Sequence, residues 1–303
     1  MKIIFMGTPD FAVNSLNRLY KDGHEIVYVF TREDKPRNRG MKLSFSPVKE
    51  AALAHNTPVY QPSTLNDGKA VDLIKSIGCD LIVVVAYGKI LPKEILELPP
   101  FGCINIHASI LPKYRGASPI QHAVMAGEKE TGVTSMFLAE HIDSGDILLV
   151  KKTDIGEDET AGDLFNKLSL LGADLLSETI SAMINGSLKR IPQNLDEVTY
   201  APLLTKEMSM INWNDTVYNI KCKVRGLNPW PVAKMELSGI VMKVFSVDIT
   251  GNIPQASPGT IVSGNKKGIE VTCSDGTVLI KELQAPGGKR MSAADYIRGR
   301  QLI

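Results

Sequence analysis

The sequence contains few cysteines and few aromatic residues. Its 303 residues include four cysteines, and only 6% are Phe, Trp or Tyr. The cysteines are widely scattered and form no C-x-x-C pair, so we expect neither disulfides nor a zinc site. The five histidines also lack the paired spacing of metal ligands. We therefore expect a protein without a metal.

Long apolar runs are missing as well. No run approaches the roughly 20 residues that a membrane-spanning helix needs. The apolar run at 3–6 is too short for a signal peptide, so we expect a cytoplasmic protein with no membrane contact. The turn after it, G-T-P-D at 7–10, is not G-x-G-x-x-G. The sequence therefore does not predict a dinucleotide site.

Strand-like and helix-like segments alternate over the first 189 residues. Apolar runs of strand length occur at 3–6, 25–31, 59–60, 81–86, 104–107, 133–138 and 147–150. Segments with helical period or helix-start signals occur at 11–21, from 46 onward, and at 67–77, 118–125 and 160–184. This alternation predicts an α/β fold with a doubly wound, mostly parallel, Rossmann-like sheet.

The pattern changes near residue 190. Residues 190–206 are irregular and contain two prolines, so we interpret them as a linker. Five short strand-like segments follow a helix at 215–225, which predicts a small OB-like β-barrel. The expected organisation is a catalytic domain at 1–189, a linker at 190–206 and a C-terminal barrel domain at 207–303.

The formal net charge is only +1, but it is unevenly distributed. Residues 207–303 hold 12 Lys and Arg against 8 Asp and Glu, whereas residues 1–206 hold 22 against 25. A mildly basic C-terminal domain is compatible with a polyanionic partner, and it is also common in ordinary domains.

A polar pair interrupts the apolar segment C-I-N-I-H at 103–107. Asn105 and His107 are two residues apart in an expected strand, so their side chains point to the same face. Asp143 follows in I-D-S-G-D. An amide and an imidazole can hold an oxyanion, and a carboxylate can tune the imidazole. This set suits attack on a carbonyl carbon by an amine, which would belong to a substrate because no protein nucleophile is evident nearby.

The segment 31–43, T-R-E-D-K-P-R-N-R-G-M-K-L, is rich in basic residues. Arg37, Arg39 and Lys42 belong to it, and no apolar periodicity precedes Met41. Long loops in compact domains are often functional, and this one is expected at the sheet edge that Asn105 also faces. A phosphate contact and an ordinary solvated loop explain the composition about equally well.

The chain resembles the methionyl-tRNA formyltransferases over essentially its whole length. The N-x-H and D-x-G patterns at 105–107 and 143–145 are common to folate-dependent formyltransferases of this fold. The loop that contains R-G at 39–40 and the segment N-P-W-P at 228–231 are typical of the formyltransferases that act on tRNA. The motifs that carry the resemblance are M-G-T-P-D-F-A at 6–12, R-G-x-K-L at 39–43, S-P-V-K at 46–49, V-V-V-A-Y-G-x-I-L-P at 83–92, G-C-I-N-I-H-x-S-x-L-P at 102–112, Y-R-G-A-S-P-I-Q at 114–121, T-G-V-T at 131–134, I-D-S-G-D at 142–146 and N-P-W-P at 228–231.

This resemblance implies a reaction and its participants. A formyl group would pass from 10-formyltetrahydrofolate, the co-substrate, to the α-amine of methionyl-initiator-tRNA, the partner. Asn105, His107 and Asp143 would be the catalytic residues. The tRNA contacts would include Arg37, Arg39 and Lys42, helped by the C-terminal domain. The folate site would be formed by Ser109, Ile110, Leu111, Pro112, Ala86, Tyr87, Gly88, Ile90 and Leu91.

Two other functions stay open at this point. The first is a formyltransferase that acts on a small amine such as an amino sugar, against which the C-terminal domain and the basic loop argue. The second is a folate- or RNA-binding module without catalysis, against which the intact Asn105, His107 and Asp143 argue. We expect the protein to be a monomer.

Overall fold

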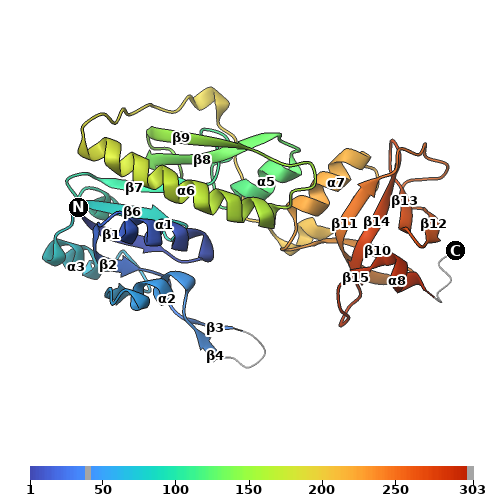
Figure 1. The fold of residues 1–303 in the computed structure, drawn as a ribbon, viewed down its shortest axis with the longest axis horizontal. Coiled ribbons are helices and arrows are strands. Elements are labelled where there is room, and N and C mark those ends of the chain that lie inside the picture. The colour runs from blue at the N-terminus through green and yellow to red at the C-terminus, as the bar shows by residue number, and fades with distance from the viewer. Residues whose placement is uncertain (38–41, 299–303) are drawn as a thin grey trace. The chain divides into compact units, whose positions relative to one another are not determined.

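The computed structural model describes residues 1–37 and 42–298, which form two compact units (Figure 1). The first unit comprises residues 1–116, 131–153 and 165–200. The second comprises residues 117–130, 154–164 and those from 201 onward. The domain boundaries drawn from the sequence, with a linker over 190–206, stay a prediction.

The first unit is built on a seven-stranded sheet with the order β5-β2-β1-β6-β7-β8-β9. Every pair from β5 to β7 is parallel, and β8 is antiparallel to β7. This arrangement confirms the predicted mostly parallel sheet. The strands are β1 (Lys2–Gly7), β2 (Glu25–Phe30), β5 (Val59–Tyr60), β6 (Leu81–Val85), β7 (Cys103–His107), β8 (Glu130–Phe137) and β9 (Ile147–Asp154).

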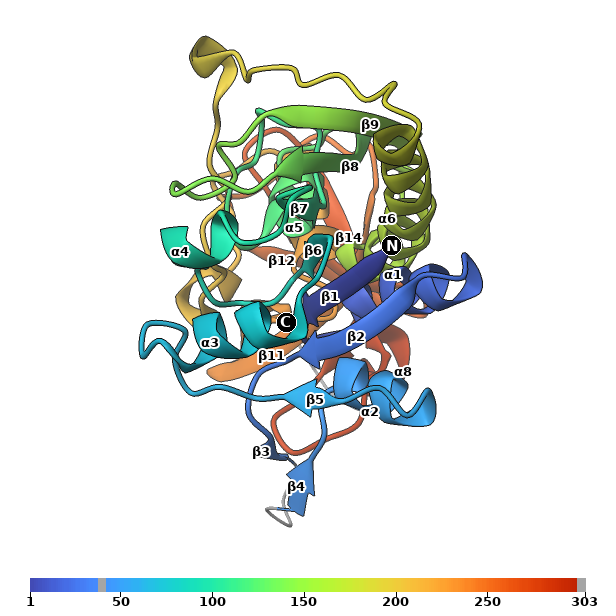
Figure 2. The same cartoon turned by 90° about the vertical axis from the view of Figure 1, so that its left-hand side faces the viewer.

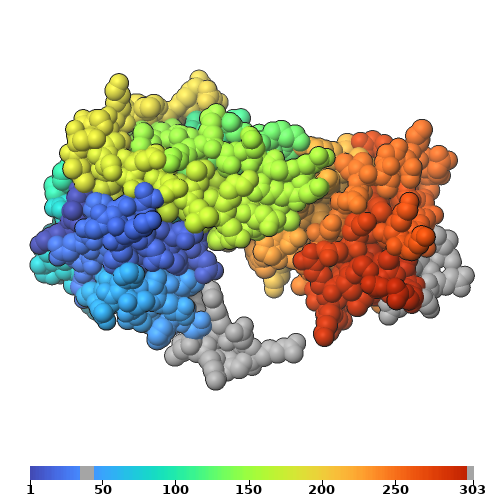
Figure 3. Space-filling view, viewed as in Figure 1, coloured from blue at the N-terminus to red at the C-terminus, as the bar shows by residue number. Residues whose placement is uncertain are grey.

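Helices cover both faces of this sheet, as expected for a doubly wound fold. Figure 2 shows α1, α2 and α6 on one face and α3 and α4 on the other. In the space-filling view, α6 forms a continuous strip of yellow-green surface (Figure 3). The helices are α1 (Asp10–Lys21), α2 (Pro47–Ala54), α3 (Lys69–Ile77), α4 (Lys93–Leu96) and α6 (Ala161–Ile184).

Local sequence signals explain where these elements begin. The hydroxyl of Ser46 accepts a hydrogen bond from the Lys49 amide at 3.1 Å, so Ser46 caps α2 as its sequence predicts. Every residue of β6 and β7 is buried, because helices cover central parallel strands on both faces. Burial of β7 includes its two polar residues, Asn105 and His107.

The basic segment contains strands that the sequence analysis does not predict. Strands β3 (Lys35–Arg37) and β4 (Lys42–Ser44) pair in antiparallel fashion, with Arg37 opposite Lys42. A two-stranded ribbon can form its backbone hydrogen bonds without an apolar face, so no period-2 pattern marks it. Arg39 lies outside the described residues.

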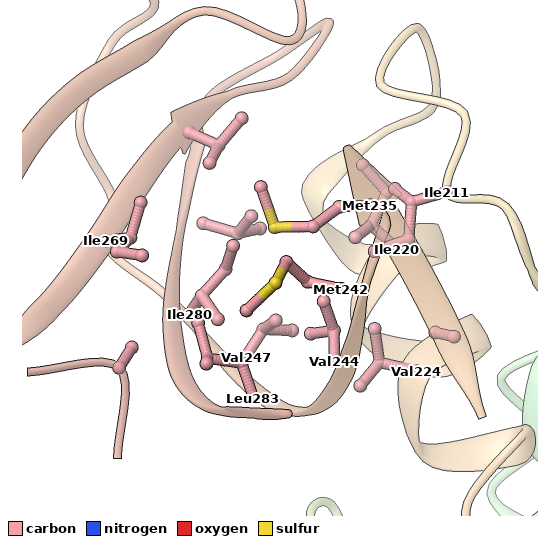
Figure 4. Close-up of a cluster of buried hydrophobic side chains, with 14 of the residues drawn as sticks. Ile211, Ile220, Val224, Met235, Met242, Val244, Val247, Ile269, Ile280 and Leu283 are labelled. Carbon is pink, nitrogen blue, oxygen red and sulfur yellow. The ribbon is translucent and has the colours of Figure 1, made fainter. Parts of the chain in front are cut away.

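The second unit contains a six-stranded antiparallel sheet with the order β10-β11-β14-β13-β12, in which β15 pairs with β14. Its core is an apolar cluster that includes Met235, Met242, Ile280 and Leu283 (Figure 4). The predicted small β-domain is therefore present. Its elements are α5 (Pro119–Met125), η2 (Lys206–Ser209), α7 (Val217–Gly226), β10 (Ala233–Leu237), β11 (Ile240–Ile249), β12 (Ile261–Asn265), β13 (Gly268–Thr272), β14 (Thr277–Gln284), β15 (Met291–Ser292) and α8 (Ala293–Ile297).

Candidate active site

Strand β7 places the predicted polar pair at the carboxyl end of the parallel part of the sheet. Asn105 is 9% exposed and His107 is 6% exposed. Their partners across the strand pair are Met136 and Thr134 of β8. Because the two residues alternate with buried isoleucines, both side chains emerge on one face of the sheet.

The amide of Asn105 has no hydrogen-bond partner among the residues that the structure describes. Its polar atoms are not fully enclosed by the protein, so they carry no penalty for a missing partner. The side chain of Asn105 is therefore available to a ligand.

The imidazole of His107 lies between two acceptors. Its Nε2 atom is 2.9 Å from the carbonyl oxygen of Tyr114. A carbonyl can only accept, so Nε2 carries a proton and donates it. The other ring nitrogen, Nδ1, is 3.6 Å from Oδ2 of Asp143. The structure thus brings together the three residues that the sequence singles out.

Asp143 comes from the loop between β8 and β9. Its Oδ2 atom accepts a hydrogen bond from the backbone N–H of Gly116 at 2.8 Å, which fixes the carboxylate beside the imidazole. Its φ of +50° is unusual for a residue other than glycine. Two residues later, Gly145 lies so close to β8 that a Cβ would overlap the carbonyl oxygen of Phe137. The glycine of D-S-G is therefore a steric requirement of this turn.

Two residues that sequence reasoning missed, Gln193 and Arg115, support this turn. The Gln193 amide donates to the carbonyl oxygens of Asp143 at 2.9 Å and Gly145 at 2.7 Å. The Arg115 guanidinium is buried and donates to Oε1 of Gln193 at 2.7 Å and 3.1 Å. A single glutamine in an irregular segment gives no local signal. Arg115 belongs to the motif Y-R-G-A-S-P-I-Q at 114–121, but the sequence analysis assigns it no role.

The first predicted folate segment, 109–112, is built around Ser109. The Ser109 hydroxyl donates to the carbonyl oxygen of Lys113 at 2.7 Å. Thr134 of β8 donates its hydroxyl to the carbonyl oxygen of Ser109 and accepts from the Leu111 amide. Ser109, Leu111 and Pro112 are buried, whereas Ile110 is half-buried. These bonds attach the segment to Thr134, the residue of β8 that lies opposite His107.

The second predicted segment, 86–91, follows β6, the parallel neighbour of β7. The Tyr87 hydroxyl is buried and unpaired in the described part of the chain. Burial raises the pKa of Tyr87 well above the ordinary value for tyrosine, so the phenol stays neutral. Gly88, at φ +79°, lies against the Arg32 guanidinium. Ala86, Gly88 and Ile90 are exposed, whereas Tyr87 and Leu91 are buried.

Other sequence expectations concern metals, membranes and tRNA contacts. Over residues 1–37 and 42–298, no group of three or more His, Cys, Asp or Glu residues could hold a metal ion. In the same ranges, no helix has the length and apolarity to cross a bilayer. Of the predicted tRNA contacts, Arg37 and Lys42 have only their backbone described.

Comparison with known proteins gives matches over the whole chain. Residues 1–180 match the family described as formyl transferase, and residues 203–301 match the formyl transferase C-terminal domain. Methionyl-tRNA formyltransferase of Alkaliphilus oremlandii is 49% identical over 302 residues, covering 100% of this chain and 97% of that protein. Methionyl-tRNA formyltransferase of Clostridioides difficile is 45% identical, with coverages of 100% and 98%.

Solved structures share the fold at lower identity. WlaRD, a sugar 3N-formyl transferase, matches with a TM-score of 0.70 at 22% identity, covering 94% of this chain and 97% of that chain. HypX from Aquifex aeolicus, in complex with tetrahydrofolic acid, matches with a TM-score of 0.63 at 17% identity. That match covers 98% of this chain and 47% of HypX, so the chain spans about half the length of HypX.

Proposed function

Because the chain belongs to the formyl transferase family, we propose that it transfers a formyl group to the α-amine of methionyl-initiator-tRNA. The formyl donor is a folate, 10-formyltetrahydrofolate. The similarity to methionyl-tRNA formyltransferases at 44–49% identity covers the full chain, which supports this substrate pair. Such a substrate locates the reaction where translation begins, in the cytoplasm.

The candidate catalytic residues would act on the charge that develops during transfer. The amine nitrogen attacks the formyl carbon, and the bond from that carbon to N10 of the folate then breaks. Negative charge collects on the formyl oxygen, to which the Asn105 amide donates, while His107 reaches that oxygen by exchanging its Tyr114 acceptor for it. The amine loses a proton and N10 gains one, so the transfer needs no net acid or base.

Asp143 has a separate task in this proposal. Its carboxylate faces Nδ1 of His107 at 3.6 Å and is too distant for a strong hydrogen bond in the free protein. We assign to the Asp143 carboxylate two roles: it orients the His107 ring, and it balances positive charge on that ring. The observation that carries the whole assignment is the unpaired Asn105 amide on the same strand face as an imidazole with an adjacent carboxylate.

The folate site is assigned to the two segments that follow β6 and β7. Ligands of parallel α/β sheets bind beyond the carboxyl ends of the strands, where both segments lie. Exposed Ile90 and half-buried Ile110 offer apolar surface, and the exposed residues Ala86 and Gly88 offer backbone polar groups. A flat heterocycle with polar edges suits such a lining.

The tRNA contacts are assigned to Arg37, Arg39 and Lys42 and to the C-terminal domain. The hairpin of β3 and β4 places two of these three residues opposite each other, at Arg37 and Lys42. The basic excess of residues 207–303 is of the sign that attracts a nucleic-acid backbone.

A formylation assay tests the proposed function. The protein is incubated with 10-formyltetrahydrofolate and methionyl-initiator-tRNA, and the tRNA is analysed for formylmethionine. Parallel reactions contain an amino sugar nucleotide instead of tRNA. Formylated tRNA is the expected product, whereas a formylated sugar alone would replace the proposal by the small-amine alternative. No product in either reaction would favour a binding module.

A further inference from the structure

The segment after α6 contacts the candidate catalytic loop through the side chains of Arg190 and Gln193. Gln193 is half-buried, while Ile191 and Leu195 on either side of it are exposed. Its amide nitrogen donates to the carbonyl oxygens of Asp143 and Gly145, at 2.9 Å and 2.7 Å. These bonds clamp the turn at two points, directly at Asp143 and two residues beyond it.

The oxygen end of the same amide is fixed by Arg115. Nε and Nη2 of this buried guanidinium donate to Oε1 of Gln193 at 3.1 Å and 2.7 Å. A guanidinium has only donors and the two carbonyl groups have only acceptors. The amide therefore has a single orientation that satisfies all four bonds. Arg115 thus determines which way Gln193 presents its donors.

The turn at Asp143 needs such support. The residue has a φ of +50°, a conformation that residues other than glycine adopt at a cost. Its carboxylate also has to stay beside Nδ1 of His107. A small rotation of the turn would move the Asp143 carboxylate away from His107. The two hydrogen bonds from Gln193 to backbone carbonyls of the turn oppose such a rotation.

The same segment also supports the opposite side of the imidazole. The Tyr114 backbone N–H donates a hydrogen bond to Oγ1 of Thr199. The Arg115 backbone N–H donates to the carbonyl oxygen of Thr199. The Tyr114 carbonyl is the acceptor for Nε2 of His107. Residues 193–199 therefore hold both groups between which the ring lies.

We propose that Gln193, fixed by Arg115, is a positioning residue that keeps the Asp143 carboxylate aligned with His107. This inference rests on the proposed function, because it assigns Gln193 to the same reaction. Gln193 touches neither the formyl donor nor the acceptor in this assignment. It acts through Asp143, and a change at Gln193 alters turnover without altering substrate binding.

The variant Gln193→Glu removes the donors of the Gln193 amide and keeps its acceptor. A glutamate has nearly the same shape and still accepts from Arg115, but it cannot donate to the two carbonyl groups. We expect kcat for Met-tRNA formylation to fall about 10- to 100-fold, because small misplacements of catalytic groups have effects of this size. KM for the folate and for Met-tRNA should not change. A wild-type kcat in the folded variant would overturn the proposal.

Arg190→Ala is the matched control. Arg190 lies in the same segment and bonds Asp146 at 2.9 Å, yet it contacts neither Gln193 nor Asp143. This variant should keep wild-type kcat if the effect belongs to the Gln193 relay. An equal loss in both variants would mean that any detachment of the segment impairs turnover, and it would overturn the specific role of Gln193.

A double variant tests whether Gln193 acts through Asp143. In an Asp143→Ala background, Gln193→Glu should cause little further loss of kcat, because residues that act as a unit are not additive. Two losses that multiply in full would overturn the proposal. If Gln193→Glu does not fold, Gln193→Met has a similar length and lacks the amide, and a wild-type kcat there would be equally decisive.

The two proposals fail in different ways. Wild-type protein that forms no formylmethionyl-tRNA contradicts the proposed function. Active wild-type protein whose Gln193 variants have wild-type kcat contradicts only the positioning role.

Discussion

Nδ1 of His107 faces Oδ2 of Asp143 at 3.6 Å, although His107 ends β7 and Asp143 lies in the loop between β8 and β9. The same carboxylate oxygen accepts a hydrogen bond from Gly116 at 2.8 Å, so it is held in place even without a ligand. An imidazole with one fixed acceptor and one adjacent carboxylate has a defined orientation.

Replacing Asn105 or His107 by alanine should lower kcat strongly and affect folate binding little. Loss of one oxyanion donor costs about 10²–10³ in rate. The double variant should lose less than the product of the two single losses, since both groups act on one charge. Steady-state kinetics and folate binding to each variant measure these effects. A His107→Ala variant with nearly normal turnover would remove His107 from the site.

Gly145→Ala should displace the turn that contains Asp143 from strand β8. Its Cβ would overlap the carbonyl oxygen of Phe137, so the turn has to move. We expect a loss of unfolding free energy of about 1–3 kcal/mol and a lower kcat in the protein that remains folded. Urea unfolding and kinetics report the two effects separately.

Ser144→Ala provides the control for that turn. The Ser144 hydroxyl donates only to the carbonyl oxygen of His141 within the same loop, at 3.0 Å. Its removal should leave kcat unchanged. If both variants lost the same stability and activity, the close approach of Gly145 to β8 would not explain the effect of Gly145→Ala.

Arg39→Ala should raise KM for Met-tRNA and leave folate binding unchanged, because the two sites are assigned to different segments. If Arg39 contacts a phosphate, the slope of log K against log salt concentration should become shallower by roughly one counterion. Binding of tRNA to wild type and variant across a salt series tests this. Identical affinities and slopes would contradict a tRNA contact at this position.

Asp34 links stability to pH at the base of the basic hairpin. Burial alone would raise the pKa of Asp34, but hydrogen bonds from Lys49 at 2.5 Å and Gln61 at 2.9 Å hold that pKa below its ordinary value. The stabilisation is therefore complete above the ordinary pKa of about 3.9 and is lost as the pH falls through the lower folded-state value.

Asp34→Asn tests this linkage. The variant should lose about 1 kcal/mol of unfolding free energy at neutral pH. Its difference from wild type should shrink as the pH falls below about 3.9. Glu33→Gln, at the exposed neighbouring position, should change little. A difference for Asp34→Asn that is independent of pH would show that the carboxylate charge is not responsible.

Much of the fold could be predicted because it depends on local patterns. Apolar runs alternate with helical periods over the first 189 residues, and this alternation predicted the mostly parallel sheet. The change to short strand-like segments after residue 206 predicted the separate β-domain. The ribbon of β3 and β4 was missed, since two short paired strands need no apolar face. The spacing of Asn105 and His107 predicted their common face, because side chains in a strand alternate with a period of two.

By itself, the sequence determined the family, the α/β order and the residue types of the candidate site, since spacing within one strand or loop fixes which side chains share a face. Only the tertiary structure decided that Gln193 and Arg115 support Asp143. Gln193 is separated by 50 residues from Asp143 and by 78 from Arg115. Contacts over such separations arise from the packing of whole elements, and they leave no periodic trace in the chain.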